Sequence, residues 1–283
     1  MKAGKALVQA MRDILLFCES FKHWNGAAQY AAMLAASRQA RLTGLYVCPV
    51  IMIPPWETPG LAQEFQDAAR QLKDEAFGAG PNFEQFAHAL GAAQVHWQVT
   101  QDEITRSLSL AGTWHDVIVI GRSQRTLWGT VGAVGNMVLG SGMPCIVVPD
   151  QTDKSGAPRI IVIAWNGSSE SMRAVHAALP LLQQADKVIV LHGKQQLPPG
   201  MADWQPPFEL SNYLAARGIG SESLLFEAAD AEIGKQLLSR AREVRADMLV
   251  MGAYGHTRFS EWVLGGATRE VLETMTMPVF MRH

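Results

Sequence analysis

The stretch Asp116–Gly121 (DVIVIG) decides the fold, because it returns late in the chain as Asp247–Gly252 (DMLVMG). Each copy is a short apolar run between an aspartate and a glycine, which is typical of a strand buried on both faces of a parallel sheet. A second match follows each copy: Met143–Val148 (MPCIVV) corresponds to Met277–Met281 (MPVFM). The chain of 283 residues therefore contains the same structural unit twice.

Apolar runs alternate with helical patterns on both sides of these stretches. In the first half we expect strands at 13–19, 44–50, 95–100, 116–121 and 144–148, with helices near 25–42, 61–76, 82–90 and 102–114. In the second half we expect strands at 159–164, 187–192, 222–226, 246–252 and 278–282, with helices near 169–184, 208–217, 231–245 and 261–274. Right-handed crossovers then require parallel sheets with helices on both faces. We predict an α/β fold of two domains, 1–150 and 151–283, each with a five-stranded, mostly parallel sheet.

Composition excludes several classes of function. The chain has 24 basic and 26 acidic residues, a net charge of -2, and neither half is basic, so we expect no nucleic acid partner and no anionic membrane surface. No window approaches the roughly 20 apolar residues of a membrane span, and the first residues do not resemble a signal peptide. We expect a cytoplasmic protein whose three cysteines, Cys18, Cys48 and Cys145, are reduced and buried.

The best candidate for a ligand site follows the strand that ends at Gly252. Ligands of open parallel sheets bind beyond the carboxyl ends of the strands, and here the chain continues as Gly252–Arg258 (GAYGHTR) and then Gly265–Thr268 (GGAT) before a helical pattern. Glycine amides ahead of a helix, with the Thr268 hydroxyl nearby, would form a phosphate cradle. Ordinary turn glycines with an N-capping Thr268 explain the same residues equally well.

Other chemical motifs are absent from the sequence. It contains no Walker motif, no G-x-S-x-G and no H-E-x-x-H, and we expect no metal site. The histidines are scattered, except that His256 lies in the glycine loop, where it could contact a phosphate. Arg122 and Arg125 could bind an anion, but we expect them to be solvated loop arginines. No general base is evident, so slow hydrolysis of a bound ligand is the most we would expect of an enzyme.

The glycine spacing resembles a known motif. G-x2-G-x9-G, formed by Gly252, Gly255 and Gly265 after a strand ending in Met-Gly, is similar to the nucleotide motif of the universal stress protein (UspA) family. The turn Ala164–Ser168 (AWNGS) resembles the first strand–turn of that family, and His192 closes the second strand as a histidine commonly does there. The resemblance covers both halves and implies two Rossmann-like domains of the adenine nucleotide alpha hydrolase type, arranged as a pseudo-dimer.

The resemblance implies a ligand and a set of contacts. The ligand would be ATP or a related adenine nucleotide, with Mg as an optional companion, bound in the second half. The implied binding residues are Ala164, Trp165, Asn166, Gly193, Met251, Gly252, Gly255, His256, Gly265, Gly266, Ala267 and Thr268. The sequence departs from the family pattern where Asn166 replaces an aspartate, Gly266 replaces a serine or threonine, and Trp165 replaces a small residue.

The first half lacks the motif. Its loop reads Gly121-Arg122-Ser123-Gln124-Arg125, with no second glycine at the required spacing, so we expect at most one nucleotide per chain. Several further glycines between 129 and 142 fit a flexible loop or a tight helix contact. Two functions remain: a stress-response regulator that binds a nucleotide and an unidentified protein partner, or an interaction protein in which both sites have decayed.

The last strand of each half predicts how the halves meet. Cys145–Val148 and Val279–Met281 are short apolar strands, and an exposed apolar edge needs a cover. Because one chain carries both strands, their pairing is intramolecular and benefits from an effective concentration of roughly millimolar or above. We therefore expect the two strands to pair antiparallel within one chain, while whole chains remain free to form a homodimer.

Overall fold

The computed structural model describes residues 10–50, 59–152, 156–193, 209–226, 232–253 and 265–283. The described strands form one ten-stranded sheet with the order β3-β2-β1-β4-β5-β10-β9-β6-β7-β8. The strands of the first half are β1 (Asp13–Cys18), β2 (Arg41–Cys48), β3 (Gln94–Gln101), β4 (Val117–Arg122) and β5 (Cys145–Pro149). Those of the second half are β6 (Ile160–Trp165), β7 (Lys187–His192), β8 (Ser221–Leu225), β9 (Met248–Gly252) and β10 (Val279–Arg282).

Nine helices connect the strands within the described ranges. Those of the first half are α1 (Gly26–Arg38), α2 (Pro59–Gly78), α3 (Gly80–Ala89), α4 (Ile104–Gly112) and α5 (Val131–Ser141). Those of the second half are α6 (Ser169–Leu182), α7 (Leu210–Ala215), α8 (Ile233–Glu243) and α9 (Gly266–Thr274). Every strand and helix expected from the sequence thus has a counterpart, and α5 is an addition.

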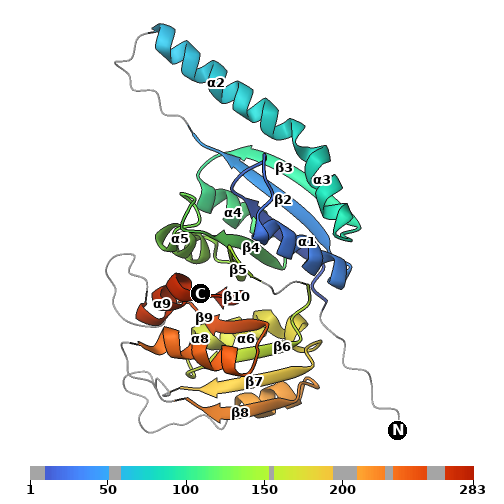
Figure 1. Ribbon diagram of the computed structural model, residues 1–283, viewed down its shortest axis with the longest axis vertical. Helices are drawn as coiled ribbons and strands as arrows, with labels where there is room; N and C mark the ends of the chain where they lie inside the picture. The colour runs from blue at the N-terminus through green and yellow to red at the C-terminus, as the bar shows by residue number, and fades with distance from the viewer. Residues whose placement is uncertain (1–9, 51–58, 153–155, 194–208, 227–231, 254–264) are drawn as a thin grey trace.

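The strand order of the second half repeats that of the first half in the reverse direction across the sheet. Neighbouring strands within each half are parallel, and the single antiparallel pair is β5 with β10, where Phe280 lies opposite Ile146. Figure 1 shows this pair at mid-height, between the blue-to-green half and the yellow-to-red half. The expected antiparallel pairing of the last strands within one chain is confirmed.

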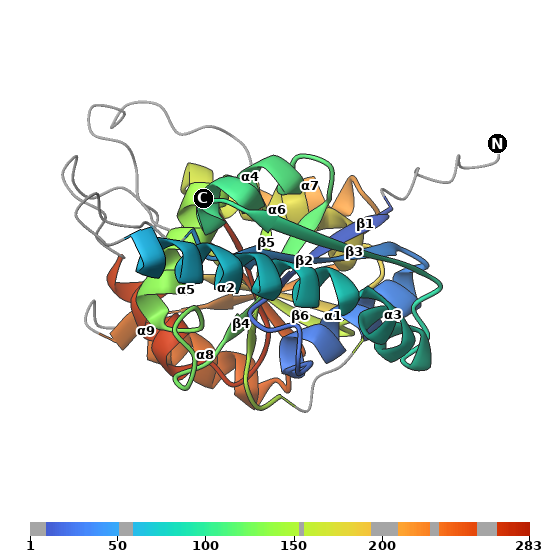
Figure 2. The ribbon, with the colours of Figure 1, turned by 90° about the horizontal axis from the view of Figure 1, so that it is seen from above.

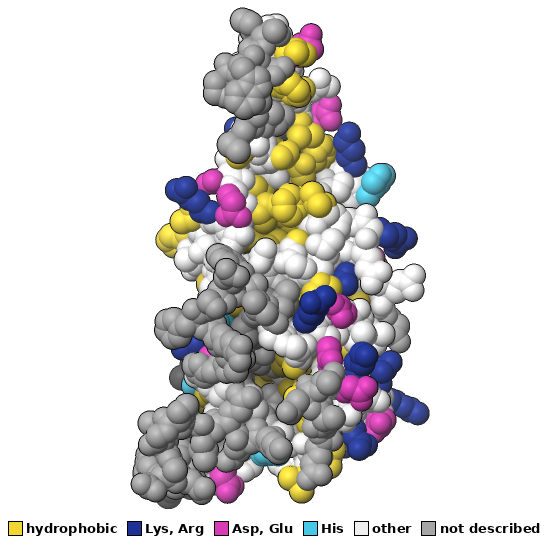
Figure 3. Space-filling model, turned by 90° about the vertical axis from the view of Figure 1, so that its left-hand side faces the viewer, with side chains coloured by type: hydrophobic (Ala, Val, Ile, Leu, Met, Phe, Trp, Pro, Cys, Tyr) yellow, Lys and Arg dark blue, Asp and Glu magenta, His cyan; other side chains and the backbone are white. Residues whose placement is uncertain are grey.

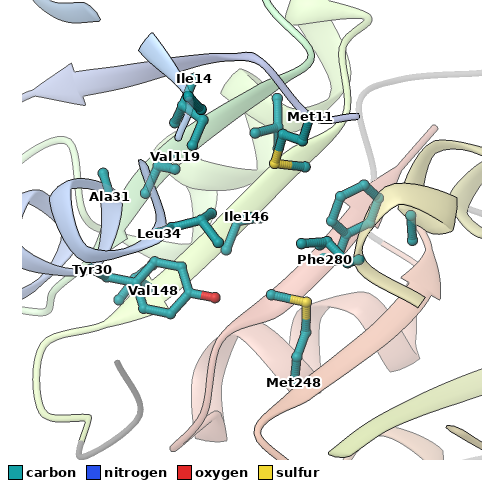
Figure 4. Close-up of a cluster of buried hydrophobic side chains, with 14 of the residues drawn as sticks. Met11, Ile14, Tyr30, Ala31, Leu34, Val119, Ile146, Val148, Met248 and Phe280 are labelled. Atoms are coloured by element: carbon teal, nitrogen blue, oxygen red, sulfur yellow. The ribbon is translucent and has the colours of Figure 1, made fainter. Parts of the chain in front are cut away.

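Helices cover both faces of the sheet (Figure 2). The buried residues of α1, α3, α6 and α7 pack on one face, and those of α4, α5, α8 and α9 pack on the other. Each face carries a hydrophobic cluster that draws residues from both halves. In Figure 4, Phe280 and Met248 of the second half lie beside Ile146 of the first. The cores are therefore continuous across the junction.

The repeat is also visible at the amino ends of the central strands. The Asp116 carboxylate accepts a hydrogen bond from the backbone N–H of Arg12 at 2.6 Å, and Asp247 accepts one from the N–H of Arg159 at 2.9 Å. Each aspartate thus satisfies a backbone donor at the start of the neighbouring strand. This role explains why both copies of the repeated stretch begin with aspartate.

Helix α2 is the least covered of the described helices. It projects beyond the end of the sheet in Figure 1, and Leu61 and Phe65 on its amino-terminal turns are 43% and 45% exposed. Hydrophobic side chains gather on the upper part of the face shown in Figure 3, toward the end of the molecule that carries α2. The helix is anchored at its other end, where the Trp97 indole N–H donates to the carbonyl oxygen of Ala76 at 2.8 Å.

Three sequence expectations can be compared with the structure here. Helix α5 occupies much of the glycine-rich stretch 129–142. Gly140 makes a tight contact in this helix, because a Cβ atom there would collide with Cγ2 of Thr105 on α4. A tight helix contact is therefore the correct explanation for Gly140. All three cysteines are free and buried, as expected. In the described part of the chain, no helix has the length and apolarity required to cross a membrane.

Candidate functional site

Two places in the sheet have the topology of a ligand site. In each half the strand order reverses between the first and fourth strands: β1 pairs with β4, and β6 pairs with β9. The helices that follow these strands leave on opposite faces, which opens the space at their carboxyl ends. The second-half site therefore lies beyond Trp165 and Gly252, and the first-half site lies beyond Cys18 and Arg122.

The turn after β6 is held by its own hydrogen bonds. The side-chain oxygen of Asn166 accepts from the N–H of Ser168 at 3.1 Å, and Gly167 has a φ of 76°, which favours glycine. The Ser168 hydroxyl accepts from the N–H of Ser171 at 3.2 Å and caps α6. Asn166 therefore uses its oxygen to shape the turn, and its amide N–H₂ provides donors for a ligand.

Gly252 brings β9 against this capped helix. A Cβ atom at this position would lie 2.6 Å from the backbone nitrogen of Ser171 and 2.7 Å from the carbonyl carbon of Glu170. Any larger residue would push α6 away from the strand. The preceding residue, Met251, has its side chain buried in the core, so only its backbone is available to a ligand.

The carboxyl ends of β6 and β7 place Trp165 next to Gly193. The Gly193 N–H donates to the carbonyl oxygen of Trp165 at 2.8 Å, which extends the strand pairing by one residue. The Trp165 ring is partly buried against the core, and Ala164 packs against the opposite face of the sheet. An aromatic surface beside a glycine is a suitable platform for a planar base.

Among the described residues, little lies near the amino end of α9. Gly265 is the N-cap residue and provides no side-chain hydrogen bond, and the first turn contains no acidic residue. A Cβ atom at either Gly265 or Gly266 would meet nothing within 4 Å. Ala267 follows on the half-buried side of this turn, and Thr268 is buried beneath it. Free amides and the helix dipole at such an end attract anions.

Two expected binding residues, Gly255 and His256, lie outside the described residues. The remaining ten fall at the carboxyl edge of the second half, on the ends of β6, β7 and β9 and on the first turn of α9. Within the described ranges, no group of three or more His, Cys, Asp or Glu side chains could hold a metal ion.

The corresponding loop of the first half is folded upon itself. The Ser123 N–H donates to the carbonyl oxygen of Gly129 at 3.0 Å, and the Gly129 N–H donates to the hydroxyl of Thr126 at 3.1 Å. A Cβ atom at Gly129 would lie 2.6 Å from the nitrogen of Ser123. The loop thus closes around Gly129 and uses its own backbone donors.

Two carboxylates occupy the edge of the first half. Glu19 follows β1 and packs near Gly121, and burial raises its pKa, to which the charge of Asp150 adds. Asp150 accepts a hydrogen bond from the Ser123 hydroxyl at 2.6 Å. Two carboxyl groups at this edge disfavour phosphate, whereas the first turn of α9 contains no acidic residue.

Arg122 departs from its expected role. We expected a solvated loop arginine, but its side chain is only 7% exposed, and it donates from Nε to the carbonyl oxygen of Leu272 at 2.7 Å. Arg125 is exposed and lies 3.7 Å from Asp150, in line with the expectation. The sequence offered no signal for the buried arginine, because its partner lies 150 residues away.

Comparison with known proteins identifies the family of the second half. Residues 158–283 match the model of the universal stress protein family. Universal stress protein Slr1230 of Synechocystis is 24% identical over 95% of this chain and 99% of its own length. The second half of the chain, residues 158–283, is a universal stress protein domain. The family model covers the second half, and the similarity to Slr1230 extends through both halves of the chain.

Solved structures share the fold over the whole chain. A universal stress protein of Archaeoglobus fulgidus aligns with a TM-score of 0.64 at 15% identity, covering 95% of this chain and 96% of that one. A functionally unknown protein of Pseudomonas aeruginosa aligns with a TM-score of 0.53 at 18% identity, covering 97% and 93%. The chain therefore has the α/β, Rossmann-like fold that its sequence predicted.

Proposed function

We propose that the second half of this chain binds an adenine nucleotide, with ATP as the first candidate. The observation that carries the proposal is the amino end of α9 at the carboxyl edge of the sheet, where a Cβ atom at Gly265 or Gly266 would meet none of the described residues within 4 Å. A triphosphate is the best match for such an end, because helix dipole and free amides act together on negative charge. Mg would accompany the phosphates as part of the ligand.

The adenosine part would lie over the ends of β6 and β7. In this arrangement Trp165 provides an apolar surface for the base, and the Gly193 position leaves room beside it. Asn166 would reach the ribose through its N–H₂ group, because its oxygen is committed to Ser168. This contact is weaker than the charged one an aspartate would make, so we expect modest affinity.

The first half would remain empty. Its loop is closed around Gly129, and Glu19 and Asp150 place two carboxyl groups near the position that phosphates would occupy. We therefore assign the protein a regulatory role with one nucleotide per chain. Binding in the second half would change the surface presented to a protein partner.

The test uses a substitution that blocks phosphate without disturbing the fold. Gly266→Asp adds a carboxylate at the first turn of α9, where the Cβ atom meets nothing within 4 Å. An acidic residue at a helix start stabilises the helix by about 0.3–1 kcal/mol, so the variant should fold. It should bind ATP at least about tenfold more weakly in calorimetry, because two negative groups would compete for the same amides. Gly266→Ala is the matched control and should bind normally.

The outcomes separate the two functions left open by the sequence. Equal ATP affinity in wild type and Gly266→Asp would place the site elsewhere. Absence of binding at millimolar nucleotide, together with no nucleotide released by acid from the purified protein, would instead favour an interaction protein without a ligand. The closed loop of the first half and the hydrogen bond from Ser168 to the Asn166 oxygen would then be features of sites that no longer bind a ligand.

A further inference from the structure

The side chain of Arg122 connects the first half to α9 of the second. Its Nε donates to the carbonyl oxygen of Leu272 at 2.7 Å, and its Nη1 donates to the carbonyl oxygen of Gly129 at 3.0 Å. Leu272 lies in the last turn of α9, whereas Gly129 belongs to the closed loop after β4. One buried guanidinium therefore joins a loop of the first half to a helix of the second.

Helix α9 depends on such a contact because of how it ends. Helix α5 ends at Gly142, whose φ of 62° turns its N–H back to the carbonyl oxygen of Leu139. Helix α9 ends instead at Met275 in an extended conformation, without a left-handed cap. The last carbonyl groups of a helix need partners, and a cation among them also interacts favourably with the helix dipole. Arg122 provides both the donor and the charge.

The second half has no side chain equivalent to Arg122. In the repeat, Asp116–Gly121 corresponds to Asp247–Gly252, so the position equivalent to Arg122 is Ala253. Alanine carries no donor on its side chain, and the second half therefore cannot return the contact to α5 by the same means. Arg122 therefore belongs to the half whose loop is closed, and the helix that it holds, α9, belongs to the half with the candidate phosphate site.

We propose that Arg122 is a positioning residue for the phosphate site of the second half, and this inference rests on the function proposed above. Helix α9 has nine residues, a length of about 14 Å. A short rigid helix held at its carboxyl end by Arg122 keeps its amino-terminal amides at a fixed place on the sheet edge. Loss of the anchor lets α9 shift, and the amides of Gly266 and Ala267 no longer converge on one anion.

The decisive comparison is between ATP and adenosine. Arg122→Met keeps the apolar stem of the side chain but removes both hydrogen bonds and the charge. We expect this variant to bind ATP about tenfold more weakly in calorimetry while adenosine affinity stays unchanged, because α9 would contact only the phosphates. Arg122→Lys should recover part of the ATP affinity. The control is Arg125→Met, which alters an exposed arginine of the same loop and should bind both ligands like wild type.

Equal weakening of ATP and adenosine would overturn the proposal, because it would indicate general damage to the second half. Unchanged ATP affinity in Arg122→Met would also overturn it, while leaving the proposed nucleotide site intact. If wild type binds no ATP, the proposed function fails. Hydrogen exchange of the ligand-free proteins then tests whether Arg122 holds α9 in place. Faster exchange in α9 of Arg122→Met, with α6 unchanged, supports the anchoring role, and equal exchange in α9 refutes it.

Discussion

Phe280 of β10 lies directly opposite Ile146 of β5, in the antiparallel pair that joins the two halves. Both side chains are fully buried, and both belong to a hydrophobic cluster that includes residues of α1 and α6. Figure 4 shows them at the junction, with Val148 and Met248 nearby. The junction is thus part of the core, and the halves should lose their structure together.

Phe280→Ala tests this cooperativity. Removing a fully buried phenylalanine leaves a cavity at the junction and should lower the free energy of unfolding by about 3–5 kcal/mol. Urea unfolding followed by circular dichroism measures the loss, and one transition should persist. Phe65→Ala, on the exposed part of α2, is the control and should cost less than about 1 kcal/mol. Similar losses in the two variants would contradict a core at the junction.

The three cysteines should be unreactive in the folded protein. Burial raises the pKa of Cys145 to about 12, with a hydrogen bond from Ser141 opposing the rise, and burial also raises the pKa of Cys48. At pH 8 the reactive thiolate form is therefore scarce as well as inaccessible. A disulfide-exchange reagent such as Ellman's should titrate no rapidly reacting thiol in the native protein and three after unfolding. One fast thiol in the native protein would disprove this expectation.

Glu19→Gln should stabilise the protein in a pH-dependent manner. The pKa of Glu19 in the folded protein lies above the ordinary value of 4.5, chiefly because of burial, so the folded chain holds this proton more tightly than the unfolded chain. Its contribution is fully present below pH 4.5 and is lost as the pH rises through the folded-state pKa. The neutral glutamine avoids this loss, and its advantage in urea unfolding should be larger at pH 7 than at pH 4.

Glu64→Gln provides the comparison for this experiment, because Glu64 is exposed on α2. Its stability difference from wild type should not change between pH 4 and pH 7. A Glu19→Gln advantage that is the same at both pH values would show that burial of the carboxyl group does not govern its effect.

Nucleotide stoichiometry should not exceed one per chain. Backbone donors of the first-half loop are used around Gly129, whereas a Cβ atom at Gly265 or Gly266 would meet none of the described residues within 4 Å. Calorimetric titration with ATP, at a protein concentration well above the dissociation constant, measures the number directly. A value near two would mean that the loop after β4 opens to accept a ligand.

The strands were the most predictable part of the fold. Each buried strand is a short apolar run between polar or glycine residues, so its place in a parallel sheet follows from the sequence. Pairing of β5 with β10 was also predictable, because apolar edges need a cover. Helix α5 was not predicted, because glycines are poor helix formers; one of its glycines, Gly140, makes a close contact with Thr105.

The candidate site was predictable only where local sequence forms it. The turn at Asn166–Ser168 and the glycines before α9 are short-range features, and both lie at the edge where the motif placed them. The acidic pair Glu19 and Asp150 was not predictable, since these residues come from the two ends of the first half. Residues that are far apart in the sequence and meet only in the folded sheet leave no local sequence pattern.

The covalent link between the halves has a consequence for how such a protein can change. In a symmetric dimer of identical subunits, every substitution occurs twice, once at each of two equivalent sites. In this chain a substitution occurs once, as the pair Arg122 and Ala253 illustrates. One half can therefore lose a ligand and gain a supporting contact while the other keeps its open helix end, without any conflict between the two roles.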